Sequence, residues 1–110
     1  MKAPTYDPET DSIYFSVRSG KSYETLEINS NILIDLSQRN NSILGVEIVG
    51  ASEFISKLFS KRINKEMVQE KLKMHLKREG EDDILLDFEL GKERYGYVIP
   101  RAYNSPVLGA

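Results

Sequence analysis

The stretch Ile43-Leu44-Gly45-Val46-Glu47-Ile48-Val49-Gly50-Ala51-Ser52-Glu53-Phe54-Ile55 contains the change of pattern that decides the fold. Before Gly50, apolar residues occupy every second position and the charged Glu47 stands between two of them, which indicates a strand with one buried face. After Gly50, apolar residues recur at the three- and four-residue spacing of a helix, and Ser52 is a suitable helix cap. The sequence therefore predicts a β region that ends near residue 52 and is followed by a helical region.

Alternating apolar and polar residues predict further strands on both sides of this stretch. Residues 12–17, 23–28 and 32–36 precede it, and residues 84–90 and 94–99 follow it. Each of these segments has apolar side chains at every second position, which is the spacing of a strand with one buried face. The connections between successive strands are short, which favours antiparallel pairing.

Between the two groups of strands, apolar positions fit helices over about residues 53–60 and 65–79, or one bent helix. A length of 110 residues fits a single domain. We therefore expect an α+β fold, with an antiparallel β-meander sheet of five to seven strands and one or two helices packed on one face. The expected order within the domain 1–110 is a β-meander over 1–52, a helical segment over 53–79, a C-terminal β-hairpin over 83–99 and a tail over 100–110.

Composition excludes several kinds of site. The chain has no cysteine, which excludes disulfides, thiol catalysis and thiolate metal sites, and its single histidine rules out any site that needs two. An apolar run of about 18 residues, the length of a membrane span, is absent. Charge appears too early in the chain for a secretory signal. We expect a soluble, cytoplasmic protein with no membrane contact, no cofactor and no metal.

Charge is distributed unevenly along the chain. Residues 57–78 carry eight basic and two acidic residues, a net charge of +6, whereas the rest carries seven basic and fifteen acidic residues, a net charge of −8. Such a segment is compatible with a solvated face, with neutralisation of the protein's own acidic sheet, or with weak nucleic-acid binding. The sequence pI of about 5.4 argues against a dedicated nucleic-acid binder. The candidate contact residues are Lys57, Lys61, Arg62, Lys65, Lys73 and Lys77.

Three motifs in the first half of the chain occur in an order that resembles a known family. They are Tyr6-Asp7-Pro8-Glu9-Thr10-Asp11-Ser12-Ile13-Tyr14, then Ile32-Leu33-Ile34-Asp35-Leu36, then Gly45-Val46-Glu47-Ile48-Val49-Gly50-Ala51-Ser52. Together they resemble a family of small uncharacterised proteins, a domain of unknown function, over about residues 3–55. The resemblance implies a compact β-meander followed by a helix, without an agreed activity. Some relatives look like the partner half of small toxin–antitoxin pairs.

The sequence departs from this family in two places. Asn40-Asn41-Ser42 replaces the usual Asp-Gly hairpin turn, and residues 60–110 have no counterpart in the short relatives. The second half of the chain either completes the core or carries a function of its own.

Two groups of carboxylates are candidates for metal-dependent catalysis. Asp7, Glu9 and Asp11 lie in one turn, and Asp35 and Glu47 fall on neighbouring strands. Carboxylate oxygens suit a hard divalent cation, but the calcium-loop spacing is absent. Aspartates in turns commonly stabilise the turn itself, which is the alternative interpretation of the first group.

A second carboxylate motif and the lone histidine are also weak signs of catalysis. Asp87 and Glu89 share a strand face, but Lys92 lies at the wrong spacing for a nuclease site. His75 has no obvious orienting partner and fits a helix surface. We therefore expect no enzymatic activity, with a carboxylate metal enzyme as a minor alternative.

Binding is the better-supported class of function. A small sheet has open edges that can accept a strand from a partner. Tyr95, Tyr97 and Tyr103 lie close together in the sequence, and tyrosine is favoured at interfaces. The alternative is that Tyr95 and Tyr97 pack under the helices. We predict a non-enzymatic protein-interaction module, antitoxin-like or self-associating, with a protein partner or a homodimer.

Overall fold

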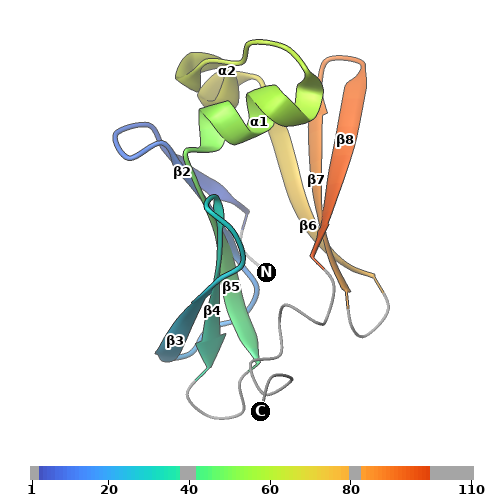
Figure 1. Ribbon diagram of the computed structural model, residues 1–110. Helices are drawn as coiled ribbons and strands as arrows, with labels where there is room; N and C mark the ends of the chain where they lie inside the picture. The colour runs from blue at the N-terminus through green and yellow to red at the C-terminus, as the bar shows by residue number, and fades with distance from the viewer. Residues whose placement is uncertain (1–2, 38–41, 80–82, 100–110) are drawn as a thin grey trace.

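The computed structural model describes residues 3–37, 42–79 and 83–99, which form two antiparallel sheets and two short helices (Figure 1). The predicted α+β fold is confirmed, and its strands divide between the two sheets. The helices are α1 (Ala51–Phe59) and α2 (Lys65–Glu70). The strands are β1 (Thr5–Asp7), β2 (Ser12–Ser16), β3 (Ser22–Glu27), β4 (Ile32–Ser37), β5 (Ile43–Val49), β6 (Lys73–Glu79), β7 (Asp83–Leu90) and β8 (Glu93–Ile99).

The five-stranded sheet has the order β1-β2-β5-β4-β3, and every neighbouring pair is antiparallel. Strands β3, β4 and β5 follow one another as a meander, whereas β2 pairs with β5 and not with β3. The predicted alternation places Ile13 opposite Ile48 and Phe15 opposite Val46 on the buried face. The apolar sets of these strands therefore form one continuous inner face.

The predicted helix over residues 65–79 is wrong beyond residue 70. Residues 73–79 instead form β6, which pairs along its whole length with β7. Leu72, His75 and Leu76 fit helical spacing, but Met74 and Leu76 also alternate with charged or polar neighbours. A short segment of this kind satisfies both periods, and hydrogen bonding to β7 decides in favour of the strand. The predicted C-terminal hairpin over 83–99 is present as β7 and β8.

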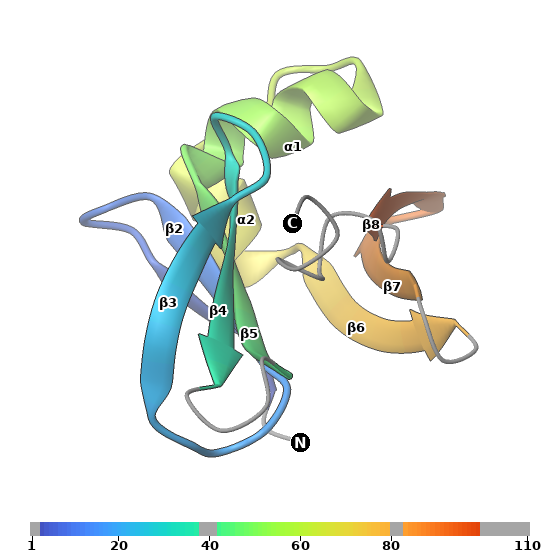
Figure 2. The same cartoon turned by 60° about the horizontal axis from the view of Figure 1, so that its bottom comes forward.

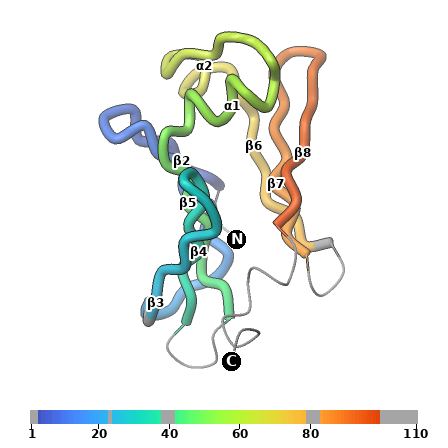
Figure 3. The backbone as a smooth tube through the Cα atoms, viewed as in Figure 1, coloured from blue at the N-terminus to red at the C-terminus, as the bar shows by residue number. Residues whose placement is uncertain are grey.

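The two sheets lie on opposite sides of the molecule, and the helices connect them at one end (Figures 1 and 2). The tube trace shows the chain passing from β5 through α1 and α2 into β6 (Figure 3). Phe15 of β2 and Phe88 of β7 meet edge to face, with ring centroids 6.2 Å apart. Ile55 and Phe59 of α1 are buried in the same apolar cluster, which therefore includes residues of both sheets. Neither described helix has the length and apolar character needed to cross a membrane.

Candidate functional site

The predicted tyrosine pair lies on β8 beneath helix α1. The Tyr95 ring meets Phe59 edge to face at a centroid distance of 4.7 Å, and Tyr97 meets Phe54 in the same way at 5.2 Å. The Asn29 side-chain amide also donates a hydrogen bond to the Tyr97 hydroxyl, at 3.0 Å. Tyr97 is therefore a half-buried packing residue, which agrees with the alternative interpretation made from the sequence.

Unlike Tyr97, two other residues of β8 have side chains that remain exposed. Tyr95 keeps 40% of its surface exposed, and Val98, which the sequence analysis did not single out, keeps 53%. Within the described part of the chain, these two are the large apolar residues that remain exposed to solvent. Both belong to β8, one of the two outer strands of the three-stranded sheet. Tyr103 lies outside the described residues.

Strand β8 is also the least protected of the four sheet edges. Edge strands are commonly protected by short length, proline, irregular register or charge. Strand β1 has three residues with Pro4 and Pro8 beside it, β3 carries two glutamates and a register shift, and β6 carries three basic residues. Strand β8 is seven residues long and is followed in the sequence by Pro100, and its segment Tyr95–Ile99 has no charged residue and no irregularity in its pairing with β7. Its alternating, uncharged sequence is the signal that could have identified this edge.

The predicted basic residues do not form one helix face, because Lys73 and Lys77 lie on β6. Three of the six candidates make ion pairs with the protein's own carboxylates. Lys57 lies 3.7 Å from Glu53, Lys61 lies 2.5 Å from Glu93, and Lys77 lies 3.6 Å from Asp87. The other three, Arg62, Lys65 and Lys73, are exposed and have no ion-pair partner within the part of the chain that the structure describes.

Asp87 is an unusual residue on the outer face of the three-stranded sheet, because only 5% of the residue is exposed although it faces outward. Arg94 covers it with a bidentate contact, with Nη2 at 2.6 Å from Oδ2 and Nε at 3.0 Å from Oδ1. These hydrogen bonds hold the pKa of Asp87 below its ordinary value, although burial acts in the opposite direction. His75 lies directly across the strand pair from Asp87, on an exposed strand position and not on a helix.

The carboxylates of the first turn have structural partners. Asp7 accepts a hydrogen bond from the Glu9 amide at 2.9 Å, as predicted for a residue that stabilises its own turn. Asp11 instead reaches helix α1, where it accepts hydrogen bonds from the Ser52 hydroxyl at 2.7 Å and the Ser52 amide at 3.1 Å. The Tyr6 hydroxyl donates to the same carboxylate at 2.6 Å.

This contact changes the predicted helix cap. The cap position of α1 is Gly50, which has a φ of 62° and no side chain to accept a hydrogen bond, so Ser52 is not the cap. Asp11, from a turn 41 residues earlier, accepts from the amide of the first helical turn in its place. We refer to Tyr6, Asp11 and Ser52 as the clasp. It joins the first and last of the three sequence motifs.

Further motif residues gather on the outer face of the five-stranded sheet. The Tyr14 hydroxyl donates to Asp35 at 3.1 Å, and the Thr25 hydroxyl donates to the other carboxylate oxygen at 2.8 Å. The Tyr14 side chain crosses Gly45 on the way, because a Cβ at that glycine would overlap the Tyr14 hydroxyl. Burial and then the Asp35 charge raise the pKa of Tyr14 to about 12. This chain of contacts connects β2, β4 and β3 across β5.

These carboxylates do not assemble a metal site. Within residues 3–37, 42–79 and 83–99, no group of three or more His, Asp or Glu side chains lies close enough together to hold a metal ion. Lys92 follows Gly91 in the exposed turn after β7, and the Asp87 carboxylate is occupied by Arg94. The nuclease-like arrangement of Asp87, Glu89 and Lys92 is therefore not formed.

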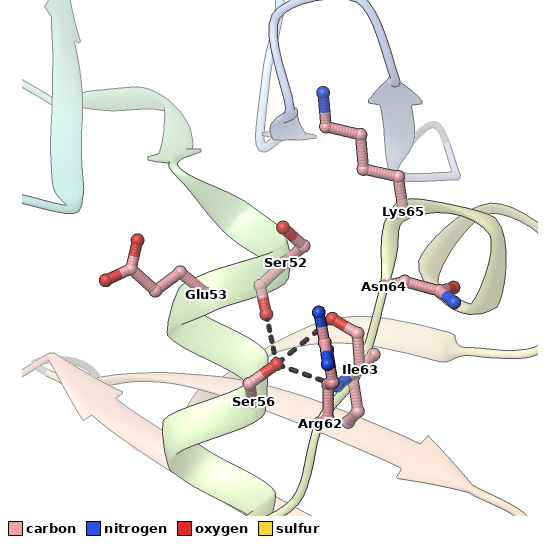
Figure 4. A pocket seen from close by; sticks show the side chains of 7 residues that line it. All are labelled: Ser52, Glu53, Ser56, Arg62, Ile63, Asn64 and Lys65. Carbon is pink, nitrogen blue, oxygen red and sulfur yellow. Dashed lines mark hydrogen bonds between the residues drawn. The ribbon is translucent and has the colours of Figure 1, made fainter.

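An open hollow of about 310 Å³ lies between α1 and the start of α2 (Figure 4). At its centre the Ser56 hydroxyl donates to the Ser52 carbonyl at 2.7 Å and accepts from the Ile63 amide at 2.8 Å. Glu53 and Lys65 extend away from Ser56 in different directions. The hollow therefore contains a structural hydroxyl that fixes the corner between the helices, and the exposed side chains of Arg62 and Lys65 belong to its lining.

In the part of the chain that the structure describes, the fold is α+β, β8 is the least charged of the outer strands, and the Asp11, Asp35 and Asp87 carboxylates are bound by neighbouring side chains. Residues 5–52 match the family model described as protein of unknown function (DUF2283). The match covers the five-stranded sheet, the clasp and the first two residues of α1, and it supports the resemblance expected from the sequence. No curated protein and no solved structure matches the chain.

Proposed function

We propose that this chain is a non-enzymatic protein-interaction module that binds an extended protein segment along the free edge of β8. The observation that carries the proposal is the difference between this edge and the other three. It is long and uncharged beyond Arg94, and it bears the exposed side chains of Tyr95 and Val98. Antitoxin-like binding and self-association are both forms of such a module. The absence of cysteine fits a reducing compartment, and we propose a cytoplasmic location.

Backbone geometry supports this mode of binding. The outer main-chain groups of an edge strand point away from the sheet and can bond to an added strand. Among the described residues, no strand pairs with the outer side of β8. An added strand would extend the ladder, while its side chains would contact Tyr95 on one face of the sheet and Val98 on the other.

The state of the polar groups supports a role without catalysis. The Asp11, Asp35 and Asp87 carboxylates each accept hydrogen bonds from protein side chains. General acid–base catalysis needs a group whose partners leave it able to exchange a proton with a substrate. His75 is the single histidine of the chain, and it makes no hydrogen bond or ion pair with the residues described.

A display library of random extended peptides, selected against the full chain, tests the proposal. We expect selected peptides to have alternating apolar residues, and Val98→Lys to weaken their binding about tenfold by placing a charge on the edge. Thr5→Lys adds the same charge to the protected edge of β1 and should leave binding unchanged. Failure to select any peptide, or equal binding to both variants, would overturn the proposal.

Nucleic-acid contact is a second candidate, favoured by the exposed and unpaired Arg62, Lys65 and Lys73. The first two line the same hollow. Binding that depends on phosphate contacts weakens steeply as salt rises. Fluorescence anisotropy of a labelled single-stranded oligonucleotide, at low and moderate salt, separates the candidates. Salt-sensitive binding that is lost in a variant with all three residues changed to alanine would favour the nucleic-acid function.

A further inference from the structure

We infer that the segment bound by β8 is β8 of a second copy of this chain, paired antiparallel about Gly96, so that two three-stranded sheets become one continuous sheet. This inference rests on the proposed function of the β8 edge and names the partner. Such a contact is isologous, since each copy gives and receives the same surface, and it closes at a dimer.

Charge favours self-pairing at this edge over the others. Strand β3 has a formal charge of −2, β6 of +2 and β1 of −1, whereas Glu93 and Arg94 make β8 neutral. Two copies of β3 or of β6 would therefore bring like charges together, which opposes pairing. Two copies of β8 would not, and Arg94 is already neutralised by Asp87 in each copy.

The sequence around Gly96 is suited to a two-fold axis. Antiparallel pairing about this residue places Tyr95 opposite Tyr97 of the partner subunit and Arg94 opposite Val98 of the partner subunit. Aromatic cross-strand pairs are favourable, and the second pair sets the aliphatic stem of an arginine against an exposed apolar side chain. Like charges do not face each other in this register.

Gly96 leaves space on the outer face of β8 for a side chain of the neighbouring strand. Here its outer surface is occupied by Leu85, since a Cβ at Gly96 would lie 2.9 Å from Leu85 Cδ1. Leu85 also lies opposite Val98 in the β7–β8 ladder. The two side chains form an apolar surface beside the axis that the partner strand would cover.

Sedimentation velocity of the full chain over a range of protein concentrations provides the first test. We expect a monomer–dimer equilibrium in which Val98→Lys weakens association about tenfold and Thr5→Lys leaves it unchanged. Val98 is more than half exposed, so the variant should fold, and urea unfolding of both variants checks this. A chain that stays monomeric, or a dimer that is insensitive to Val98→Lys, would overturn the inference.

A distance measurement provides the second test without changing the edge. Because the chain has no cysteine, Lys92→Cys in the exposed turn before β8 accepts a single spin label. Pairing about Gly96 offsets the two labelled positions by eight residues along the strands, or about 27 Å between Cα atoms. Double electron–electron resonance should give a distance near this value, and a clearly different one would refute the register. If the chain is monomeric but still binds selected peptides in a Val98-dependent way, the self-pairing fails and the proposed function stands.

Discussion

Replacing Asp11 by alanine is expected to destabilise the fold strongly, because it removes the centre of the clasp. One carboxylate accepts hydrogen bonds from the Tyr6 hydroxyl, the Ser52 hydroxyl and the Ser52 amide. Hydrogen bonds to a charged group contribute about 1.5–3 kcal/mol each, and a side chain that binds the first amides of a helix contributes about 1 kcal/mol. These terms overlap at one group and are not additive. Asp11 also has a φ of 55°, which alanine adopts at a cost of about 1 kcal/mol.

The expected total is a loss of about 3 kcal/mol in the free energy of unfolding for Asp11→Ala. Asp11→Asn keeps one acceptor oxygen and tolerates positive φ, so it should lose about 1 kcal/mol. Asp7→Ala is the matched control, because it removes the same charge from the same turn but breaks one exposed hydrogen bond. Its cost should stay below about 1 kcal/mol.

Urea unfolding followed by circular dichroism measures all three variants. For a chain of this length the Asp11→Ala effect corresponds to a fall in Tm of roughly 12 °C. Equal costs for Asp11→Ala and Asp7→Ala would refute the reasoning, since the clasp would then contribute nothing beyond a turn. A double-mutant cycle with Tyr6→Phe isolates the contribution of the Tyr6–Asp11 hydrogen bond.

Three further predictions follow from the outer faces of the sheets. Gly45→Ala should cost about 2 kcal/mol, because its Cβ would overlap the Tyr14 hydroxyl and lie 2.9 Å from the Phe15 carbonyl of the neighbouring strand β2. Unchanged urea stability would contradict this. With a Tyr14 pKa of about 12 against an ordinary 10.0, the unfolded chain releases this proton first, so the free energy of unfolding should fall between about pH 10 and 12. That fall should be smaller in Tyr14→Phe, and equal pH profiles would be inconsistent with the Asp35 contact. Arg94→Gln should destabilise the fold near neutral pH, and the loss should shrink only as the pH falls below the ordinary 3.8 of an aspartate towards the lowered pKa of Asp87, because protonation of this carboxyl removes the ion pair.

Residues of the first half of the chain could be placed well from the sequence, because their period is unambiguous. Ile13, Phe15, Ile32 and Ile34 fall at every second position of their strands, and all four are buried as predicted. Strand order was harder to predict, because local connections do not reveal that β2 crosses to pair with β5. The two-residue spacing of apolar side chains shows which side chains share a face of the sheet, but it does not show which strand lies next to which.

The second half was less predictable where two periods coincide. Lys73 to Glu79 reads equally well as the end of a helix, and its partner in β7 lies beyond an intervening turn. The same error affected the basic segment 57–78, since its basic residues were expected in a helical region and are divided between α1, the following loop, α2 and β6. Ion pairs between segments, such as Lys61 with Glu93, depend on tertiary contacts that no local pattern specifies.

The edge candidate was only partly visible in the sequence. Tyr95 was identified because three tyrosines lie close together near the end of the sequence. Val98 was missed because a single valine in a strand sequence does not show whether it is exposed or buried. Recognising it required the knowledge that β8 is an outer strand. The least protected edge is found by comparing the outer strands with one another, and the outer strands are known only once the topology is known.

The position of the clasp has a consequence for how this protein is organised. Asp11 binds residue 52, which is the last residue of the segment matched by the family model. Hydrogen bonds of Asp11 thus connect the first turn of the matched segment 5–52 to its last residue, Ser52, from which the chain continues into the remainder of α1. Helix α1 therefore leaves the five-stranded sheet from a fixed point, and the clasp sets the position from which this helix packs into the apolar cluster shared by both sheets.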